Sequence, residues 1–284
     1  MGPMPRDFRV MGVVNVTPDS FSDGGRFLDP EAAVAHALRL AAEGADILDF
    51  GGESTRPGAE PVPAEEERRR VVPVIERVAG AGVAAQLSID TSKAEVAEAA
   101  IAAGATLVND VTALRGDPRM AAVVAEHGVD CCLMHMRGEP RTMQIEPRYD
   151  DVVAEVAAFL EERTAFALAQ GVAEERILVD PGIGFGKALE HNLELLRRLD
   201  ELVAGGRPVV VGTSRKSFLG LLTGRAEPAD RLAGTIATNV LALERGASVF
   251  RVHDVAPVRE ALAVAAATVS ERWTPTTSSG TTTS

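Results

Sequence analysis

Residues 13–25 read VVNVTPDSFSDGG, and this stretch decides the fold class of the chain. A mostly apolar run from Phe8 to Val14 stops at Asn15, and a polar loop rich in hydroxyls, carboxylates and glycine follows. Apolar runs of this length that are bounded by turn residues are typical of buried strands. A strand that ends in reactive side chains is the unit from which α/β barrels build active sites. The stretch therefore predicts one strand of such a barrel.

The same succession of apolar strand, polar cluster and helix recurs along the chain. Strict alternation of strands and helices implies a parallel sheet, and an α/β barrel uses roughly 250 residues. We therefore expect a single (β/α)8 TIM barrel over residues 1–273. The tail 274–284 is nearly all Thr and Ser, and we expect it to be disordered. The predicted strands are 8–15, 47–50, 85–89, 107–109, 130–134, 177–180, 209–212 and 249–252, and the predicted helices are 30–43, 64–81, 92–103, 118–126, 150–170, 189–202, 228–245 and 256–271.

The composition excludes several classes of partner. Acids outnumber bases 41 to 29, for a net charge of -12, which argues against nucleic-acid or anionic-membrane partners. No apolar run reaches the roughly 20 residues that span a bilayer, and the N-terminus lacks the pattern of a signal peptide. The two cysteines, Cys131 and Cys132, are adjacent and are expected to be packing residues. We expect a reducing cytoplasm.

Polar residues end every predicted strand, where the active site of a barrel lies. Asp90, Asn109 and Asp180 end or directly follow three strands, and their carboxylates and amide suit a flat heterocycle with alternating donors and acceptors. Asp90 could instead cap the next helix, and Asn109 could be a turn residue. Eight strands that all end in polar groups favour one shared site over separate structural roles.

A second set of residues supplies cations and hydroxyls, which suit phosphate, diphosphate or carboxylate. Arg251 could instead pair with a helix carboxylate, and His253 could be a core histidine. Asn15 and the acidic loop after it could hold Mg²⁺ against a diphosphate, because Mg²⁺ prefers oxygen ligands. The residues thus indicate a heterocycle held deep and an anion held at the rim. The second set is Thr55, Arg56, Ser214, Lys216, Ser217, Arg251 and His253.

These segments together resemble the dihydropteroate synthases, the folate-pathway enzymes that sulfonamides inhibit. The resemblance extends from Val10 to about Val255. A single motif could arise by chance, but the whole set in the family's order is highly specific. The motifs are NVTPDSFSDGG at 15–25, GGESTRPG at 51–58, SIDTSK at 88–93, ND at 109–110, MHM at 134–136, DPGIGFGK at 180–187, SRKS at 214–217 and RVHDV at 251–255.

The resemblance implies a reaction and assigns residues to it. The family condenses 6-hydroxymethyl-7,8-dihydropterin diphosphate with 4-aminobenzoate to give 7,8-dihydropteroate and diphosphate. By motif, Asp90, Asp180 and Lys216 are the residues at the reacting pterin, and Asn15 lies next to Mg²⁺. The implied pterin ligands are Asp90, Asn109, Met134, Asp180 and Lys216; the diphosphate ligands are Asn15, Arg251 and His253; the 4-aminobenzoate ligands are Thr55, Arg56, Pro57, Phe185, Lys216 and Ser217.

These assignments agree with a dissociative reaction path, in which the C–O bond to diphosphate breaks before the amine attacks. A basic rim with Mg²⁺ makes diphosphate a good leaving group, and carboxylates such as Asp90 and Asp180 could stabilise the cation left at the pterin methylene. A neutral aromatic amine is already nucleophilic, and the motifs contain no dedicated base. The loops 17–28 and 53–63 are expected to close over the intermediate and exclude water.

Two other functions stay open at this point. A pterin-binding methyltransferase domain that serves a corrinoid protein would share the ring-binding residues but would not need the first loop, STRPG or SRKS. A non-catalytic relative that binds pterin would have degenerate loops, and none is visible. Because the family is commonly dimeric, we also expect a homodimer, which an outward apolar face on the late helices would permit.

Overall fold

Eight parallel strands form the centre of the molecule in a computed structural model that describes residues 8–17, 30–54, 59–138, 143 and 145–269. Their order in the sheet is β6-β5-β4-β3-β2-β1-β8-β7. An isolated parallel bridge between Val179 and Val209 connects the two edges, so the sheet is a nearly closed barrel. The predicted (β/α)8 TIM barrel is confirmed. The strands are β1 (Arg9–Asn15), β2 (Ile47–Gly51), β3 (Gln86–Asp90), β4 (Leu107–Asp110), β5 (Asp130–Met134), β6 (Ile177–Asp180), β7 (Val210–Val211) and β8 (Val249–Val252).

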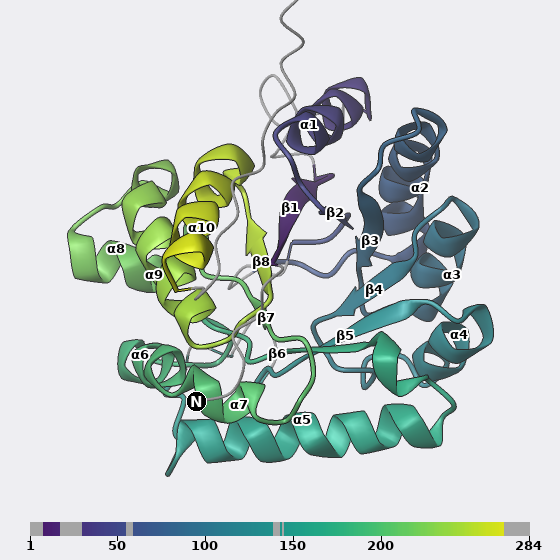
Figure 1. Cartoon of the computed structure of the whole chain (residues 1–284). Coiled ribbons are helices and arrows are strands. Elements are labelled where there is room, and N and C mark those ends of the chain that lie inside the picture. Colours follow the sequence, from purple (N-terminus) through teal and green to yellow (C-terminus); the bar gives the residue numbers. More distant parts are fainter. Residues whose placement is uncertain (1–7, 18–29, 55–58, 139–142, 144, 270–284) are drawn as a thin grey trace, which may run out of the picture.

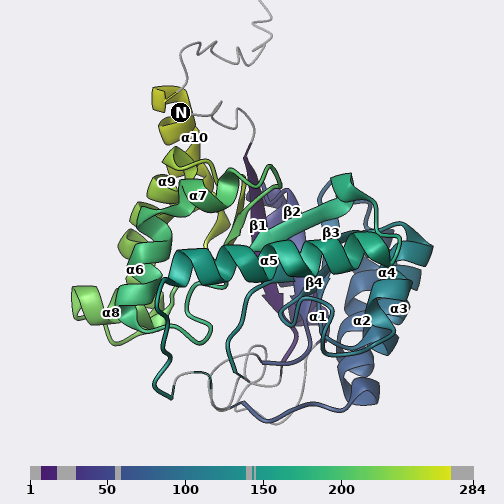
Figure 2. The same cartoon turned by 90° about the horizontal axis from the view of Figure 1, so that it is seen from below.

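Helices surround the strands, with α2, α3 and α4 on one side and α8, α9 and α10 on the other (Figure 1, Figure 2). None of the helices in the described part of the chain is long and apolar enough to cross a membrane. The helices are α1 (Pro30–Ala42), α2 (Ala64–Gly80), α3 (Ala94–Ala102), α4 (Met120–His127), α5 (Val152–Ala169), α6 (Leu189–Arg197), α7 (Leu199–Val203), α8 (Ser217–Thr223), α9 (Leu232–Glu244) and α10 (Val255–Val269), with short 3-10 helices η1 (Glu174–Arg176) and η2 (Pro228–Arg231).

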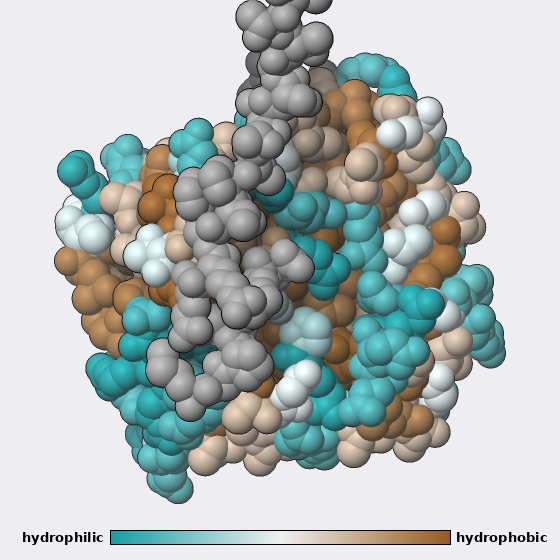
Figure 3. Space-filling model, viewed as in Figure 1, coloured by the Kyte–Doolittle hydropathy of each residue, from teal (hydrophilic) through white to brown (hydrophobic). Residues whose placement is uncertain are grey.

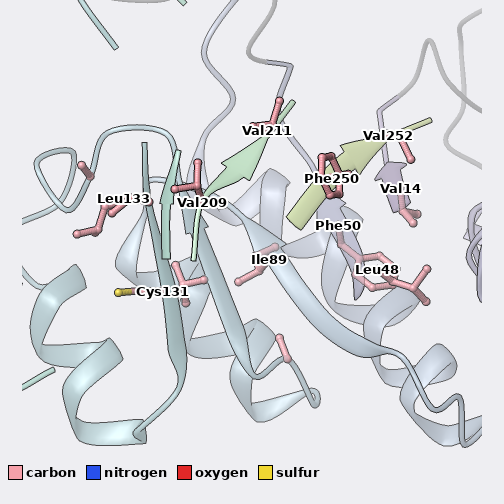
Figure 4. Packing of buried hydrophobic residues seen from close by; sticks show 14 of the residues in the cluster. Val14, Leu48, Phe50, Ile89, Cys131, Leu133, Val209, Val211, Phe250 and Val252 are labelled. Carbon is pink, nitrogen blue, oxygen red and sulfur yellow. The ribbon is translucent and has the colours of Figure 1, made fainter. Parts of the chain in front are cut away.

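Alternation along the strands divides the buried residues into two layers. The outward side chains, which include Phe50, Cys131 and Phe250, pack between strands and helices, and Figure 4 shows part of this layer. Cys132 belongs to the layer inside the barrel, so the two buried cysteines face opposite ways and have the predicted packing role. The inner apolar layer is Met11, Ile47, Leu107, Cys132, Leu178, Val210 and Val249.

A polar layer lies directly above the inner apolar layer. Because side chains on one face of a strand recur every second residue, the next inward positions on β2, β4, β6 and β8 are Asp49, Asn109, Asp180 and Arg251. The strands therefore place charged side chains at the carboxyl end of the barrel and apolar ones beneath them.

The structure differs from the predicted helices in three places. The helix predicted over 189–202 is broken at Arg198, which has φ −111° and ψ 29° and whose side chain pairs with Asp151. The helix predicted from Pro228 begins as the 3-10 helix η2, and the regular helix α9 starts only at Leu232, after Arg231, whose side chain donates to the carbonyls of Arg215 and Ala226. Helix α8 was not predicted, since seven residues are too few to display a helical period.

Candidate active site

Four strand ends meet in one row at the mouth of the barrel. The registers pair Asn15 with Gly51, Gly51 with Asp90, and Asp90 with Asn109. Gly51 has no side chain, and a Cβ at this position would lie 3.8 Å from Asp90 Oδ2 and 3.9 Å from Asn15 Oδ1. The amide oxygen of Asn15 and the carboxylate of Asp90 therefore border one space above Gly51.

Arg251 connects this row to the floor of the site. Its Nε donates to Asp49 Oδ2 at 2.7 Å, and one Nη donates to Asp90 Oδ2 at 2.7 Å. Asp49 also accepts from Asn109 Nδ2 at 3.0 Å and from Ser88 Oγ at 2.6 Å. Burial alone would lower the pKa of Arg251, but the two carboxylates outweigh it and raise this pKa. Arg251 is thus a fixed cation between strands β2, β3 and β8.

Asp90 combines a shifted pKa with an unused acceptor. Burial raises its pKa to about 7, and Asp49 adds to this shift although Arg251 opposes it. The second carboxylate oxygen, Oδ1, is buried and has no hydrogen-bond partner. A buried acceptor without a donor is costly in a folded protein unless a ligand satisfies it. Asp90 therefore offers an open acceptor to a ligand in the barrel mouth.

Asp180 and Lys216 lie on the opposite side of the mouth. The backbone N–H of Gly182 donates to Asp180 Oδ1 at 2.7 Å, and Lys216 Nζ donates to the carbonyl of Ile183. Burial lowers the pKa of Lys216 to about 8, against the opposing effect of the Asp180 carboxylate. Burial raises the pKa of Asp180, and Lys216 opposes that shift. The ammonium also lies 4.5 Å from the centre of the Phe185 ring, which is a cation–π contact.

An apolar wall borders the polar groups. Met134, at the end of β5, packs with Val111, Met136 and Met143, and Phe185 packs against this cluster. Thioethers and aromatic rings adapt to the face of a flat ligand. The mouth therefore has hydrogen-bonding groups at its floor and soft apolar groups at its side.

The glycine-rich loop after β6 is held rigidly in place. Gly182 has φ +66°, and a Cβ there would lie 1.9 Å from the carbonyl oxygen of His135. The buried Nζ of Lys187 donates to the carbonyls of Gly182 and Phe185, each at 3.0 Å, and contacts His135 Nδ1 at 2.9 Å. Burial lowers the pKa of His135 to about 2, so its imidazole is neutral, and in the tautomer protonated at Nε2 its Nδ1 accepts from Lys187. These contacts fix the backbone that carries Phe185.

The outer rim carries the remaining predicted residues. His253, after β8, meets Ser214 through its Nδ1 at 3.0 Å and its backbone N–H at 3.2 Å. Ser217 is exposed in the first turn of α8. Deep in the mouth, the arrangement offers hydrogen bonds to a flat polar ring. Above that ring, it offers hydroxyl, imidazole and ammonium groups.

A sequence profile described as pterin binding enzyme matches residues 11–253. Dihydropteroate synthase from Neisseria meningitidis serogroup B is 49% identical over 261 residues, which is 90% of this chain and 91% of the relative. The chain belongs to the dihydropteroate synthase family. The enzyme of Escherichia coli K12 is 48% identical over 263 residues, 93% of this chain and 92% of that protein.

Solved dihydropteroate synthases share the same fold. The Xanthomonas albilineans enzyme with 4-aminobenzoic acid has a TM-score of 0.86 at 56% identity and covers 91% of this chain and 92% of its own. The Yersinia pestis enzyme in a sulfonamide drug complex has a TM-score of 0.87 at 44% identity, covering 92% of this chain and 94% of its own. The predicted family resemblance is confirmed.

The structure brings most of the predicted site residues together. The structural alternative for Asp90 is wrong, because α3 begins at Ala94 with Lys93 at its N-cap. Arg251 pairs with strand carboxylates, not with a helix carboxylate. Thr55, Arg56 and Pro57 lie outside the described residues. Those gathered at the mouth are Asn15, Asp90, Asn109, Met134, Asp180, Phe185, Lys216, Ser217, Arg251 and His253.

Sequence reasoning missed Asp49 and Ser88, which lie inside β2 and β3 instead of at their ends. Both side chains are fully buried. A signal was present in the segment ILDFG, where one carboxylate interrupts an apolar strand. A charge at a buried strand position is rarely found without a partner, so it could have indicated a charged residue on another strand.

Proposed function

We propose that this chain condenses 6-hydroxymethyl-7,8-dihydropterin diphosphate with 4-aminobenzoate and releases 7,8-dihydropteroate and diphosphate. The observation that carries the proposal is the buried, unpartnered Oδ1 of Asp90 beside Asn109 in the barrel mouth. A pterin ring presents N–H donors to such an acceptor. Family relatives have been solved with 4-aminobenzoic acid and with 7,8-dihydropteroate. The chain is accordingly a transferase of folate synthesis.

The pterin occupies the floor of the mouth in this proposal. Asp90, Asn109 and Asp180 bind its ring edge, and Met134 contacts its face. Lys216 lies between the Asp180 side of the site and the Phe185 ring, where it can reach both substrates. The 4-aminobenzoate lies against Phe185, Lys216 and Ser217, and Thr55, Arg56 and Pro57 complete its site.

The chemistry exchanges one bond at the pterin methylene. The C–O bond breaks with its electron pair leaving on the diphosphate, and the amine nitrogen lone pair forms the C–N bond. The amine then loses one proton to solvent. Ionised Asp90 and Asp180 stabilise positive charge on the pterin as the C–O bond breaks, because opposite charges interact strongly at a buried site. His253 and the third guanidinium nitrogen of Arg251 bind the departing diphosphate.

The residues at the mouth also fit Mg²⁺. The amide oxygen of Asn15 borders the same space as Asp90 Oδ2, and Mg²⁺ takes oxygen ligands from a few side chains, substrate phosphates and water. No group of three or more His, Cys, Asp or Glu side chains that could hold a metal occurs in the described ranges. We assign Asn15 as the protein ligand, because its amide oxygen borders the space above Gly51 at the barrel mouth. Bound Mg²⁺ would neutralise charge on the diphosphate.

One assay tests the proposed function. Purified chain with Mg²⁺ and the pterin diphosphate should release diphosphate only when 4-aminobenzoate is present, and should form dihydropteroate in equal amount. Release without that dependence, or no release from folded protein that binds the pterin, would contradict the proposal. The second result would instead support a non-catalytic pterin-binding protein.

The pH dependence of kcat/KM for the pterin diphosphate should be bell-shaped. Asp90 must be ionised to stabilise the positive charge that develops on the pterin, so activity should rise with pH through about 7. Lys216 loses its charge above its pKa of about 8, so activity should fall there. Initial rates between about pH 5.5 and 9.5 measure both limbs. Lys216→Gln should remove the alkaline limb only, and an alkaline limb that persists in this variant would belong to another group.

We also propose a homodimer formed through α9 and α10. An open, mostly apolar groove runs between these helices, and its lining includes Ile236, Val240, Leu243, Ala261 and Val264. Figure 3 shows further apolar surface on the side of α8 and α9, where Leu221 and Leu222 are exposed. Apolar patches of this kind commonly mark protein–protein contacts, and a second copy would cover both helices symmetrically.

We place the enzyme in the cytoplasm, which the free cysteine thiols fit.

The homodimer makes a prediction about oligomeric state. The double substitution Leu241→Glu and Val264→Glu should give a monomer, because it places charges on exposed apolar positions of both helices, 45% and 68% exposed. Sedimentation velocity measures the change. Leu168→Glu is the matched control on α5, where the side chain is 38% exposed, and it should leave the dimer intact. A wild-type monomer at micromolar concentration would contradict the proposal.

A further inference from the structure

Asp49 joins three other strands of the barrel through its carboxylate, yet it lies below the strand ends where the substrates are placed. It is fully buried in the middle of β2, with Val13 and Ser88 as its register neighbours. Its carboxylate accepts three hydrogen bonds, which come from β3, β4 and β8. No predicted substrate contact uses this residue.

The partners of Asp49 are the groups that would touch the pterin diphosphate. It accepts one N–H of Asn109 Nδ2, which fixes the plane of the amide and the direction of its oxygen. It holds Arg251 by Nε, so the guanidinium plane is fixed between Asp49 and Asp90. Ser88 donates to the other carboxylate oxygen and keeps Asp49 from rotating. A single buried carboxylate thus sets the orientation of two groups of the site.

We propose that Asp49 is a positioning residue of the pterin site. It orients Arg251 and Asn109, and it keeps the Arg251 guanidinium paired with two carboxylates, its own and that of Asp90. The inference rests on the proposed function of these two residues. Without Asp49, Arg251 would pair with Asp90 alone, and its guanidinium would turn toward that carboxylate. Asp90 would then be a weaker acceptor for the pterin and a weaker stabiliser of positive charge.

The proposal predicts effects that a merely structural role would not produce. Asp49→Asn should lower kcat/KM for the pterin diphosphate by about 100-fold, as expected when reacting groups are displaced by about 1 Å. The KM for 4-aminobenzoate should change by less than about 3-fold, because the partners of Asp49 all lie on the pterin side. The acid limb of the pH profile should move to lower pH, because the charge of Asp49 contributes to the raised pKa of Asp90.

Ile47→Val is the control for packing. Ile47 is also fully buried and points inward two residues earlier on β2, but it belongs to the apolar layer. This variant should lower the melting temperature while leaving the pH profile and both KM values in place. The wild-type assay in the same series tests the proposed function separately, since it depends on no variant.

Ser88→Ala provides a second test that keeps the charge of Asp49. It should lower kcat/KM for the pterin diphosphate by about 3- to 10-fold without moving the acid limb, because only the hydrogen bond that holds the carboxylate is lost. Folded Asp49→Asn enzyme with kcat/KM within about 3-fold of wild type and an unmoved acid limb would overturn the proposal. If Asp49→Asn does not fold, an unchanged kcat/KM in Ser88→Ala overturns it.

Discussion

The Asp90→Asn enzyme is expected to lose about 10³-fold in kcat/KM for the pterin diphosphate and to remain folded. Arg251 already donates to one oxygen of Asp90, so an amide in this place would keep its oxygen toward Arg251. Its NH₂ group would then face the pterin where Oδ1 now offers an acceptor. The substitution also removes a negative charge beside the carbon that becomes positive as diphosphate leaves.

The stability of this variant follows from the direction of the Asp90 pKa shift. The pKa rises from 3.8 to about 7 on folding, so the unfolded chain binds fewer protons between these values. Stability contributed by this group is therefore lost as pH rises from about 4 to 7. At pH 8 the ionised carboxylate opposes folding by its burial, and Asn removes that opposition.

Asp130→Asn is the matched control for this prediction. Asp130 begins β5 at the amino end of the barrel, where it pairs with Arg176 and Gln86. The same change of group there should alter kcat/KM by less than about 2-fold. Steady-state rates and circular dichroism at pH 8 measure activity and folding together. Near-normal activity of folded Asp90→Asn would show that Asp90 does not act on the pterin.

Removal of the buried cation should have the largest effect on folding. Arg251→Met is expected to lower the free energy of unfolding by about 3 kcal/mol, because it leaves the fully buried Asp49 without its charged partner. Methionine retains much of the aliphatic volume, so the loss reports charge and hydrogen bonding more than packing. Activity should also disappear, since Asp49 and Asp90 lose the cation that connects them. Urea unfolding followed by fluorescence or circular dichroism gives the free energy.

Two further variants separate the causes of this loss. Arg259→Met breaks an ion pair with Asp46 whose partners are 40% and 32% exposed, and it should cost only about 0.5 kcal/mol. Asp49→Asn combined with Arg251→Met should regain at least about 1 kcal/mol relative to the sum of the single variants, because the double variant no longer buries the Asp49 carboxylate without its charged partner. If the changes in the free energy of unfolding of the two single variants simply add up in the double variant, Asp49 and Arg251 do not interact directly.

Much of the site could be predicted from strand ends. Asp90, Asn109 and Asp180 stand at the carboxyl ends of apolar runs, and the barrel topology brings such ends together whatever the loops do. The partnership of Arg251 could not be predicted. Its two carboxylates are 202 and 161 residues away along the chain, and one of them lies inside a strand.

The division between sequence and tertiary structure has a physical basis. The period of the apolar residues and the polar strand ends depend on neighbours a few residues apart, so they determined eight strand–helix units and one catalytic face. Register and barrel closure depend on pairing between distant strands, and only these decided that Asp49, Asn109 and Arg251 share one hydrogen-bond network. They also decided the raised pKa of Asp90, since burial and nearby charge arise only when the barrel closes around it.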